Sequence, residues 1–176
     1  MNKLIIWTLI GVLFSLVEMS FIRSLPGIFV FTPFVFALCV YVVQHQGVPA
    51  FIWWLPIHGL ILDVYAVGHP SIHTVSYLLG AAIVSLSAKH VFSNRSYYGV
   101  LTCAMIGFLG ILLSEAFFSF LKQFSHIQLE WVIFLQESVY RLVLLLAVIT
   151  LFYPFAKRIR SVLSASALLP EIRKTY

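Results

Sequence analysis

Six apolar runs, each close to the length of a membrane span, follow one another along nearly the whole chain. A helix that crosses a bilayer needs about 20 predominantly apolar residues. Of the 176 residues, 61% are hydrophobic and only 10% are charged, which leaves too little polar surface to cover a soluble fold. The pattern predicts an all-α polytopic membrane protein, with about six transmembrane helices in one bundle over residues 1–160 and a short basic cytoplasmic tail over residues 161–176. The runs are residues 4–22, 26–43, 48–67, 71–88, 99–121 and 131–155.

The basic residues predict how these spans are oriented, because Lys and Arg are enriched in cytoplasmic loops. With the N-terminus inside, the cytoplasmic segments hold eight Lys and Arg residues, and the external loops hold only Arg23 and Lys122. Both termini are therefore predicted to be cytoplasmic, in a multi-pass protein of the plasma or inner membrane. The net charge of +5 then reflects orientation and contact with anionic membrane lipid, and no nucleic-acid partner is expected. The eight are Lys3, Lys89, Arg95, Lys157, Arg158, Arg160, Arg173 and Lys174.

Five ionisable residues fall inside the predicted spans. A charge at the centre of a membrane helix costs about 2.5–3.5 kcal/mol on insertion scales, and such residues almost always face the bundle interior or a water-filled cavity. In the predicted orientation all five lie in the outer half of the membrane. They are expected to form an intramembrane polar cluster, either an outward-facing ligand pocket or a surface that contacts a partner protein. The five are Glu18, Asp63, Glu115, Glu137 and Arg141.

Glu137 and Arg141 are spaced i, i+4, which places them on one helix face as an ion pair. One interpretation is mutual neutralisation, so that their helix can insert. The other is that Arg141 also binds Asp63 or Glu115 from a different helix and so fixes the bundle. Because four acids face one arginine, the remaining carboxylates are expected to be protonated or paired elsewhere, for example by a partner subunit.

Three histidines near the middle of the chain, His58, His69 and His73, raise the question of a metal site. His69 precedes Pro70, which biases it away from helix, so a helical i, i+4 ligand pair with His73 is not expected. The prediction is that these histidines lie in loops or at the interface without a function, and that the chain holds neither a metal nor a cofactor.

The Glu137-x-x-x-Arg141 spacing is similar to the motif of the CPBP type of membrane protease. That family has paired glutamates, whereas Gln136 precedes Glu137 here, and no histidine motif follows in a later helix. There is also no GxSxG for a rhomboid-like serine nucleophile. We therefore expect no enzymatic activity.

A tight hairpin is predicted at residues 59–73, GLILDVYAVGHPSIH. Gly68 suits the end of one helix, and Pro70 suits the first turn of the next. With Gly59 and Asp63, these residues resemble the Gly-apolar-Asp-apolar-Gly-x-Pro signature of the MreD family. The spacing from Asp63 to Gly68 is one residue longer here, and Ile72 stands where the family often has glycine.

The resemblance implies a non-catalytic scaffold of the bacterial cell-shape and peptidoglycan-synthesis machinery. MreD-like proteins associate with the bitopic MreC, and through it with MreB filaments, a RodA-type glycosyltransferase and its transpeptidase partner. The signature hairpin, Gly59, Asp63, Gly68 and Pro70, is implied to be structural or to face a partner.

An alternative follows from the six-helix architecture, which is similar to that of the substrate-binding S subunits of ECF vitamin transporters. An outward pocket containing the intramembrane acids and Arg141 would suit a small polar ligand. Such subunits dock their coupling partner through an Ala-x-x-x-Ala-like pattern on the first helix. The first run here contains no alanine, and Gly11 and Ser15 are a weak substitute at the same spacing.

Overall fold

The computed structural model describes residues 2–46, 52–66, 72–90, 96–123 and 131–165, and within these residues it contains helices and no strand. The prediction of an all-α fold is confirmed. The helices in chain order are α1 (Asn2–Ser20), η1 (Ile22–Ser24), η2 (Gly27–Phe31), α2 (Phe34–Gln46), α3 (Trp54–Tyr65), α4 (Ile72–His90), α5 (Tyr97–Gln123) and α6 (Trp131–Ala165), where η marks a 3₁₀ helix.

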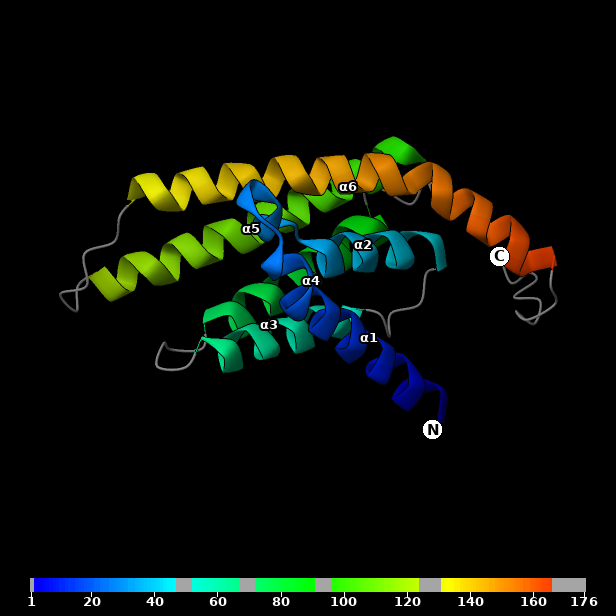
Figure 1. Cartoon of the computed structure of the whole chain (residues 1–176), viewed down its shortest axis with the longest axis horizontal. Coiled ribbons are helices and arrows are strands. Elements are labelled where there is room, and N and C mark those ends of the chain that lie inside the picture. Colours follow the sequence, from blue (N-terminus) through cyan, green and yellow to red (C-terminus); the bar gives the residue numbers. More distant parts are fainter. Residues whose placement is uncertain (1, 47–51, 67–71, 91–95, 124–130, 166–176) are drawn as a thin grey trace.

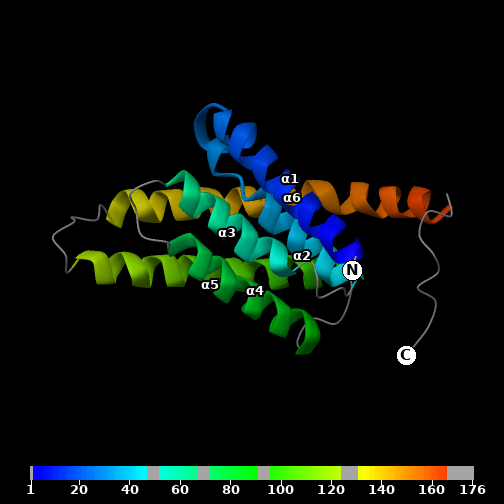
Figure 2. The same ribbon diagram turned by 90° about the horizontal axis from the view of Figure 1, so that it is seen from below.

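The two longest helices, α5 and α6, run along the long axis of the molecule (Figure 1). The shorter helices pack beside part of this pair, so that the end of α5 and the start of α6 extend past them (Figure 2). Helix α2 lies at the centre and contacts each of the other five α-helices. Its side chains Val35, Phe36, Cys39 and Val40 are buried in the core.

Helix α4 packs closely against α3 on one side and α5 on the other. Small residues permit this approach, because a Cβ added at Gly80 would lie 2.4 Å from Ile111 of α5. On α5, Gly107 in turn receives Val84 of α4, whose side chain would lie 2.3 Å from an added Cβ. The Ser- and Gly-rich composition of the 71–88 run thus serves close helix packing.

Three of the described helices are long and apolar enough to cross a membrane: Ile72–His90, Tyr97–Leu121 and Trp131–Phe155. Helices α2 and α3 have 13 and 12 residues. At about 1.5 Å per residue they measure about 18–20 Å, less than the roughly 30 Å hydrocarbon core. Within the described residues, α2 and α3 are therefore shorter than the second and third apolar runs.

Proline explains the break in the second run, residues 26–43. Pro33 restricts the residue before it to extended conformations, and Thr32 adopts φ −69°, ψ 114°. The chain therefore forms the short η2, extends through Thr32, and begins the regular helix α2 at Phe34. Non-helical backbone is tolerated at membrane depth where it is buried in protein or lines a cavity, and Thr32 and Pro33 line a cavity.

Helix α6 continues as one helix through Pro154 to Ala165, so it crosses the predicted boundary between residues 160 and 161. A proline inside a helix removes one backbone hydrogen bond and favours a bend, and α6 bends toward its C-terminal end (Figure 1). The rest of the predicted tail, residues 166–176, lies outside the described residues.

One face of α1 packs into the bundle through its small residues. A Cβ added at Gly11 would lie 2.5 Å from the ring of Trp54 on α3. Ser15 is fully buried, and its hydroxyl donates to the carbonyl of Gly11 over 3.0 Å. Leu9 and Leu13 lie on the outer surface of the same helix.

Replacing Gly11 with valine is expected to destabilise the protein by about 1–3 kcal/mol, because overpacking a filled core forces side chains and backbone to shift. Thermal unfolding in detergent, followed by tryptophan fluorescence, measures the effect. Leu13→Val on the outer face of α1 is the matched control and is expected to change stability by less than about 0.5 kcal/mol. Equal stability of both variants would show that α1 does not pack on Trp54 in this way.

Candidate functional site

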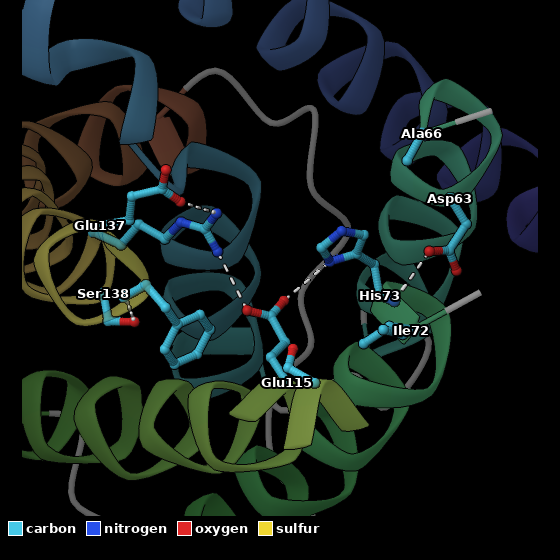
Figure 3. Close-up of a pocket in the computed structure, with 10 residues that line it drawn as sticks. Asp63, Ala66, Ile72, His73, Glu115, Glu137 and Ser138 are labelled. Carbon is cyan, nitrogen blue, oxygen red and sulfur yellow. Dashed lines mark hydrogen bonds and ion pairs between the residues drawn. The ribbon is translucent and has the colours of Figure 1, made fainter. Parts of the chain in front are cut away.

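A polar cavity of about 220 Å³ lies between the α3–α4 pair and the α5–α6 pair (Figure 3). Helix α6 packs on α2, α5 and η2, but in the described residues it makes no close backbone contact with α3 or α4. Helix α5 forms the floor of the resulting space, through Glu115 and Ser119. The remaining lining residues are Asp63, Ala66, Ile72 and His73 on one side, and Phe134, Glu137, Ser138 and Arg141 on the other.

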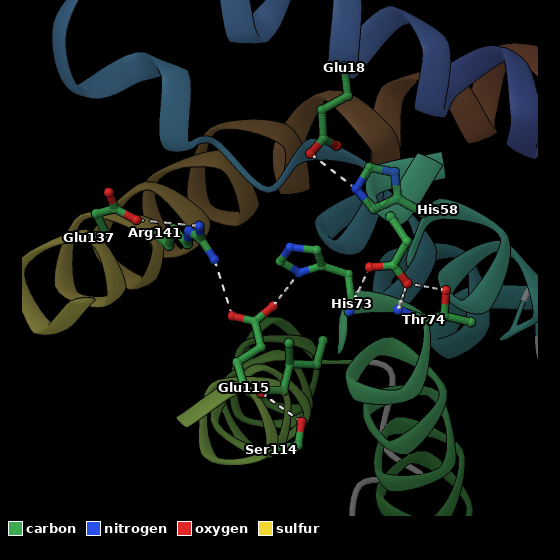
Figure 4. A network of polar contacts seen from close by, with 10 residues as sticks. Glu18, His58, His73, Thr74, Ser114, Glu115, Glu137 and Arg141 are labelled. Carbon is green, nitrogen blue, oxygen red and sulfur yellow. Dashed lines mark hydrogen bonds and ion pairs between the residues drawn. The ribbon is translucent and has the colours of Figure 1, made fainter. Parts of the chain in front are cut away.

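The centre of the site is the buried carboxylate of Glu115, which has a partner from each wall (Figure 4). Its Oε1 lies 3.0 Å from Nδ1 of His73, at the start of α4. Its Oε2 accepts a hydrogen bond from Arg141 of α6 over 3.3 Å. The expectation that Arg141 joins two helices through Glu115 or Asp63 agrees with this geometry for Glu115, but Asp63 makes no contact with Arg141 among the described interactions.

Arg141 also pairs with Glu137 one turn earlier on α6, at 3.6 Å. The i, i+4 pair predicted from the sequence is present. Glu137 is the more open of the two carboxylates, since its side chain is 38% exposed against 6% for Glu115. Arg141 thus serves two carboxylates, one buried and one facing the cavity.

Asp63 has a different role, at the joint between α3 and α4. Its carboxylate accepts hydrogen bonds from the backbone N–H groups of His73 (3.0 Å) and Thr74 (2.8 Å), and from the Thr74 hydroxyl. The first N–H groups of a helix lack intrahelical partners, and a negative charge is favourable there. Asp63 therefore caps α4 from the end of α3.

Gly59 lies one turn before Asp63 on the same face of α3. A Cβ added there would lie 2.8 Å from the backbone oxygen of His73 and 2.9 Å from the Cα of Thr74. Only glycine permits the start of α4 to come this close, so Gly59 and Asp63 act on the same two residues. The other half of the signature hairpin, Gly68 and Pro70, lies outside the described residues.

Glu18 of α1 repeats this arrangement at the start of α2. Its Oε2 accepts a hydrogen bond from the backbone N–H of Val35 over 2.6 Å, and its Oε1 lies 3.4 Å from Nε2 of His58 (Figure 4). His58 is only 1% exposed, and its ring meets that of Tyr77 edge-on at 5.3 Å. The polar cluster that was predicted as one site thus consists of three groups of contacts, centred on Glu18, Asp63 and Glu115. The last two are connected by His73, which contacts both acids.

A second cavity, of about 260 Å³, adjoins the first on the side of α1 and η2. Glu18, Arg23, Thr32 and Tyr77 are among its lining residues. Four charged or titratable side chains line both cavities, and they therefore form the boundary between the two. The four are His73, Glu115, Glu137 and Arg141.

The histidines are the part of the site that sequence reasoning missed. His58 and His73 lie inside α3 and α4, not in loops, and each contacts a carboxylate of another helix. The acids that Arg141 does not fully neutralise thus have partners elsewhere, as expected. For Glu18, Asp63 and Glu115 these partners come from this chain. A histidine inside an apolar run, like an acid there, predicts a paired or functional position. The positions of His58 and His73 inside apolar runs could therefore have identified them from the sequence.

Within the described residues, no group of three or more His, Cys, Asp or Glu side chains is arranged to hold a metal ion. His69 is not among those residues. What the site offers chemically is a set of hydrogen-bonding groups that open onto a cavity, chiefly the side chains of Glu137, His73 and Arg141.

A search of protein-family models, of curated proteins and of solved structures finds no match to this chain.

Proposed function

We propose that this chain is a non-catalytic membrane scaffold of the MreD type, a subunit of the machinery that elongates the bacterial cell wall and sets cell shape. Its proposed partners are a bitopic MreC-like protein, wall-synthesis enzymes and the surrounding lipid. The observation that carries the proposal is the joint between α3 and α4. Gly59 and Asp63, the described half of the signature hairpin, both hold α4 against α3, which is the structural role that the resemblance implies.

The way the polar groups are satisfied also supports a scaffold. Each of the buried carboxylates Glu18 and Glu115 has two partners within the chain, and Asp63 has three donors. Buried carboxylates with partners on other helices hold those helices in one arrangement. Neither cavity reaches the about 300–1,000 Å³ typical of small-molecule sites.

The small residues of α1 argue against the transporter alternative. Docking a coupling partner through Gly11 and Ser15 would need these residues on the outer surface of the bundle. Both instead face inward, Gly11 against Trp54 and Ser15 fully buried.

The second candidate remains an S subunit of an ECF-type vitamin transporter, and the pair of polar cavities favours it. Their volumes are about 220 and 260 Å³. If the bridge from Arg141 to Glu115 opened, the two cavities would merge to a size that suits a small polar ligand. In this reading Glu115, Glu137 and Arg141 bind the ligand.

We further propose that the chain crosses the cell membrane six times with both termini in the cytoplasm, on the excess of basic residues in the segments assigned to that side. The short helix α2 would complete its crossing with η2, which precedes it.

The test is recovery of the tagged protein from its native membrane in mild detergent, with mass spectrometry of the proteins that accompany it. A bitopic coiled-coil protein with wall-synthesis enzymes is the expected result. A pair of ABC-type ATPases would overturn the scaffold and favour the transporter. An equally tagged, unrelated polytopic protein controls for non-specific recovery.

A further inference from the structure

The cavity between α4 and α6 carries an excess of negative charge. Three carboxylates line it, Asp63, Glu115 and Glu137, against one guanidinium, Arg141. Ionised carboxylates therefore outnumber the guanidinium in this lining. Such an excess is costly at membrane depth, where a charge needs a partner of opposite sign.

The distances show where the charge is least compensated. Asp63 is held by three donors at the start of α4. Glu115 and Glu137 share Arg141, at 3.3 and 3.6 Å. Charge-assisted N–H···O bonds are about 2.7–2.9 Å long, so both contacts are looser than a well-formed ion pair. Glu137 makes no other ion pair or hydrogen bond within the described residues, and its side chain opens onto the cavity.

The size and surroundings of the cavity suit one long basic side chain. Its volume of about 220 Å³ is below that of usual small-molecule sites. Apolar side chains, Ala66, Ile72 and Phe134, complete its lining. Lys and Arg combine an apolar stem with a charged head, and such side chains reach polar groups from within a membrane in this way.

The outer surface next to the cavity is apolar. On α4, Val75 and Leu79 follow Ile72 at helical spacing and are 41% and 45% exposed. Because α6 does not close over α4 in the described residues, this face is available to another helix.

We propose that the cavity receives a lysine or arginine from a transmembrane helix of a partner protein, whose head group pairs with Glu137 and Glu115. The inference rests on the proposed scaffold function and names the partner's chemistry: a single membrane helix with one basic residue at the depth of Arg141. The helix lies along the exposed face of α4.

A peptide titration tests the pairing directly. The protein, in lipid nanodiscs, is titrated with fluorescent Leu/Ala transmembrane peptides of about 22 residues, which carry Lys, norleucine or Glu at one position in the outer half. The Lys peptide is expected to bind about tenfold tighter than the norleucine peptide. Equal affinities would overturn the proposal.

Variants of α6 identify the group responsible. Glu137→Gln keeps the shape of the side chain and is expected to abolish the preference for Lys. Gln136→Leu is the matched control, because Gln136 is exposed on the same turn and lines neither cavity, and it is expected to keep the preference. Glu137→Lys should instead prefer the Glu peptide, a gain of binding that a misfolded variant cannot give. A preference for Lys that survives in Glu137→Gln would contradict the proposal.

Free butylammonium and butylguanidinium distinguish a helix from a soluble amine. If they bind the wild-type protein in a manner that depends on Glu137, while the Lys peptide shows no preference, the cavity is a small-amine site and the helix is excluded.

Recovery of Glu137→Gln from the native membrane separates this inference from the proposed function. Wall-synthesis partners that accompany both the wild type and Glu137→Gln would leave the scaffold standing and remove the proposed contact. If neither the wild type nor Glu137→Gln recovers wall-synthesis partners, the proposed scaffold function fails. The peptide titration alone then tests whether the cavity binds a basic membrane helix.

Discussion

Replacing Arg141 with methionine is expected to lower the free energy of unfolding by about 1–3 kcal/mol, because the buried carboxylate of Glu115 loses one of its two partners. The change leaves the carboxylates of Glu115 and Glu137 without their shared cation. Methionine keeps much of the apolar stem, so the loss reports the charge and its hydrogen bonds rather than packing. Thermal unfolding in detergent, followed by the fluorescence of the four tryptophans, measures it.

Two further variants make this result specific. Arg23→Met removes an exposed arginine that makes no ion pair within the described residues, and it is expected to cost less than about 0.5 kcal/mol. Adding Glu115→Gln to Arg141→Met neutralises the stranded buried charge and is expected to recover a large part of the loss. A stable Arg141→Met protein would show that Arg141 does not compensate Glu115.

Replacing Asp63 with leucine is expected to cost about 2–3 kcal/mol, because hydrogen bonds to a charged acceptor contribute about 1.5–3 kcal/mol and the half-buried N–H groups of α4 lose their acceptor. Asp63→Asn keeps a side-chain oxygen that can cap the helix, so it is expected to cost less than about 1 kcal/mol. The same unfolding experiment compares them.

A double-mutant cycle with Thr74→Val checks the contact itself. Thr74 donates to Asp63 through both its backbone N–H and its hydroxyl, and valine removes only the hydroxyl. Coupling of about 0.5 kcal/mol or more between the two sites is expected for residues in contact. Strict additivity of Asp63→Leu and Thr74→Val would mean that Asp63 does not cap α4.

The two capping carboxylates explain how helices α2 and α4 can begin inside this bundle. Water is scarce at membrane depth, so the free N–H groups at a helix start must be satisfied by protein. Glu18 supplies an acceptor to α2 from α1, and Asp63 supplies one to α4 from α3. In each case the preceding α-helix ends within three residues of its acid, which brings the carboxylate to the point where the next helix of the bundle starts.

Local patterns in the sequence were enough for the all-α fold, for apolar helices of span length in the second half of the chain, and for the pair of Glu137 and Arg141. These features depend on helical spacing of three or four residues and on composition, which can be read along a single segment. The start of α2 at Phe34 also has a local cause, the proline before it.

Only the tertiary structure decided which residues meet across helices. His73 and Glu115 are 42 positions apart, Arg141 and Glu115 are 26 apart, and the acid that caps α2 lies 17 positions before the N–H it accepts from. No periodicity links such residues, because their contact depends on how the helices cross and how far each one extends. The sequence alone therefore predicted polar groups at one depth of the membrane. The packing of six helices determined that the histidines would pair with the acids, that Asp63 would bind backbone rather than Arg141, and that a cavity would remain between α4 and α6.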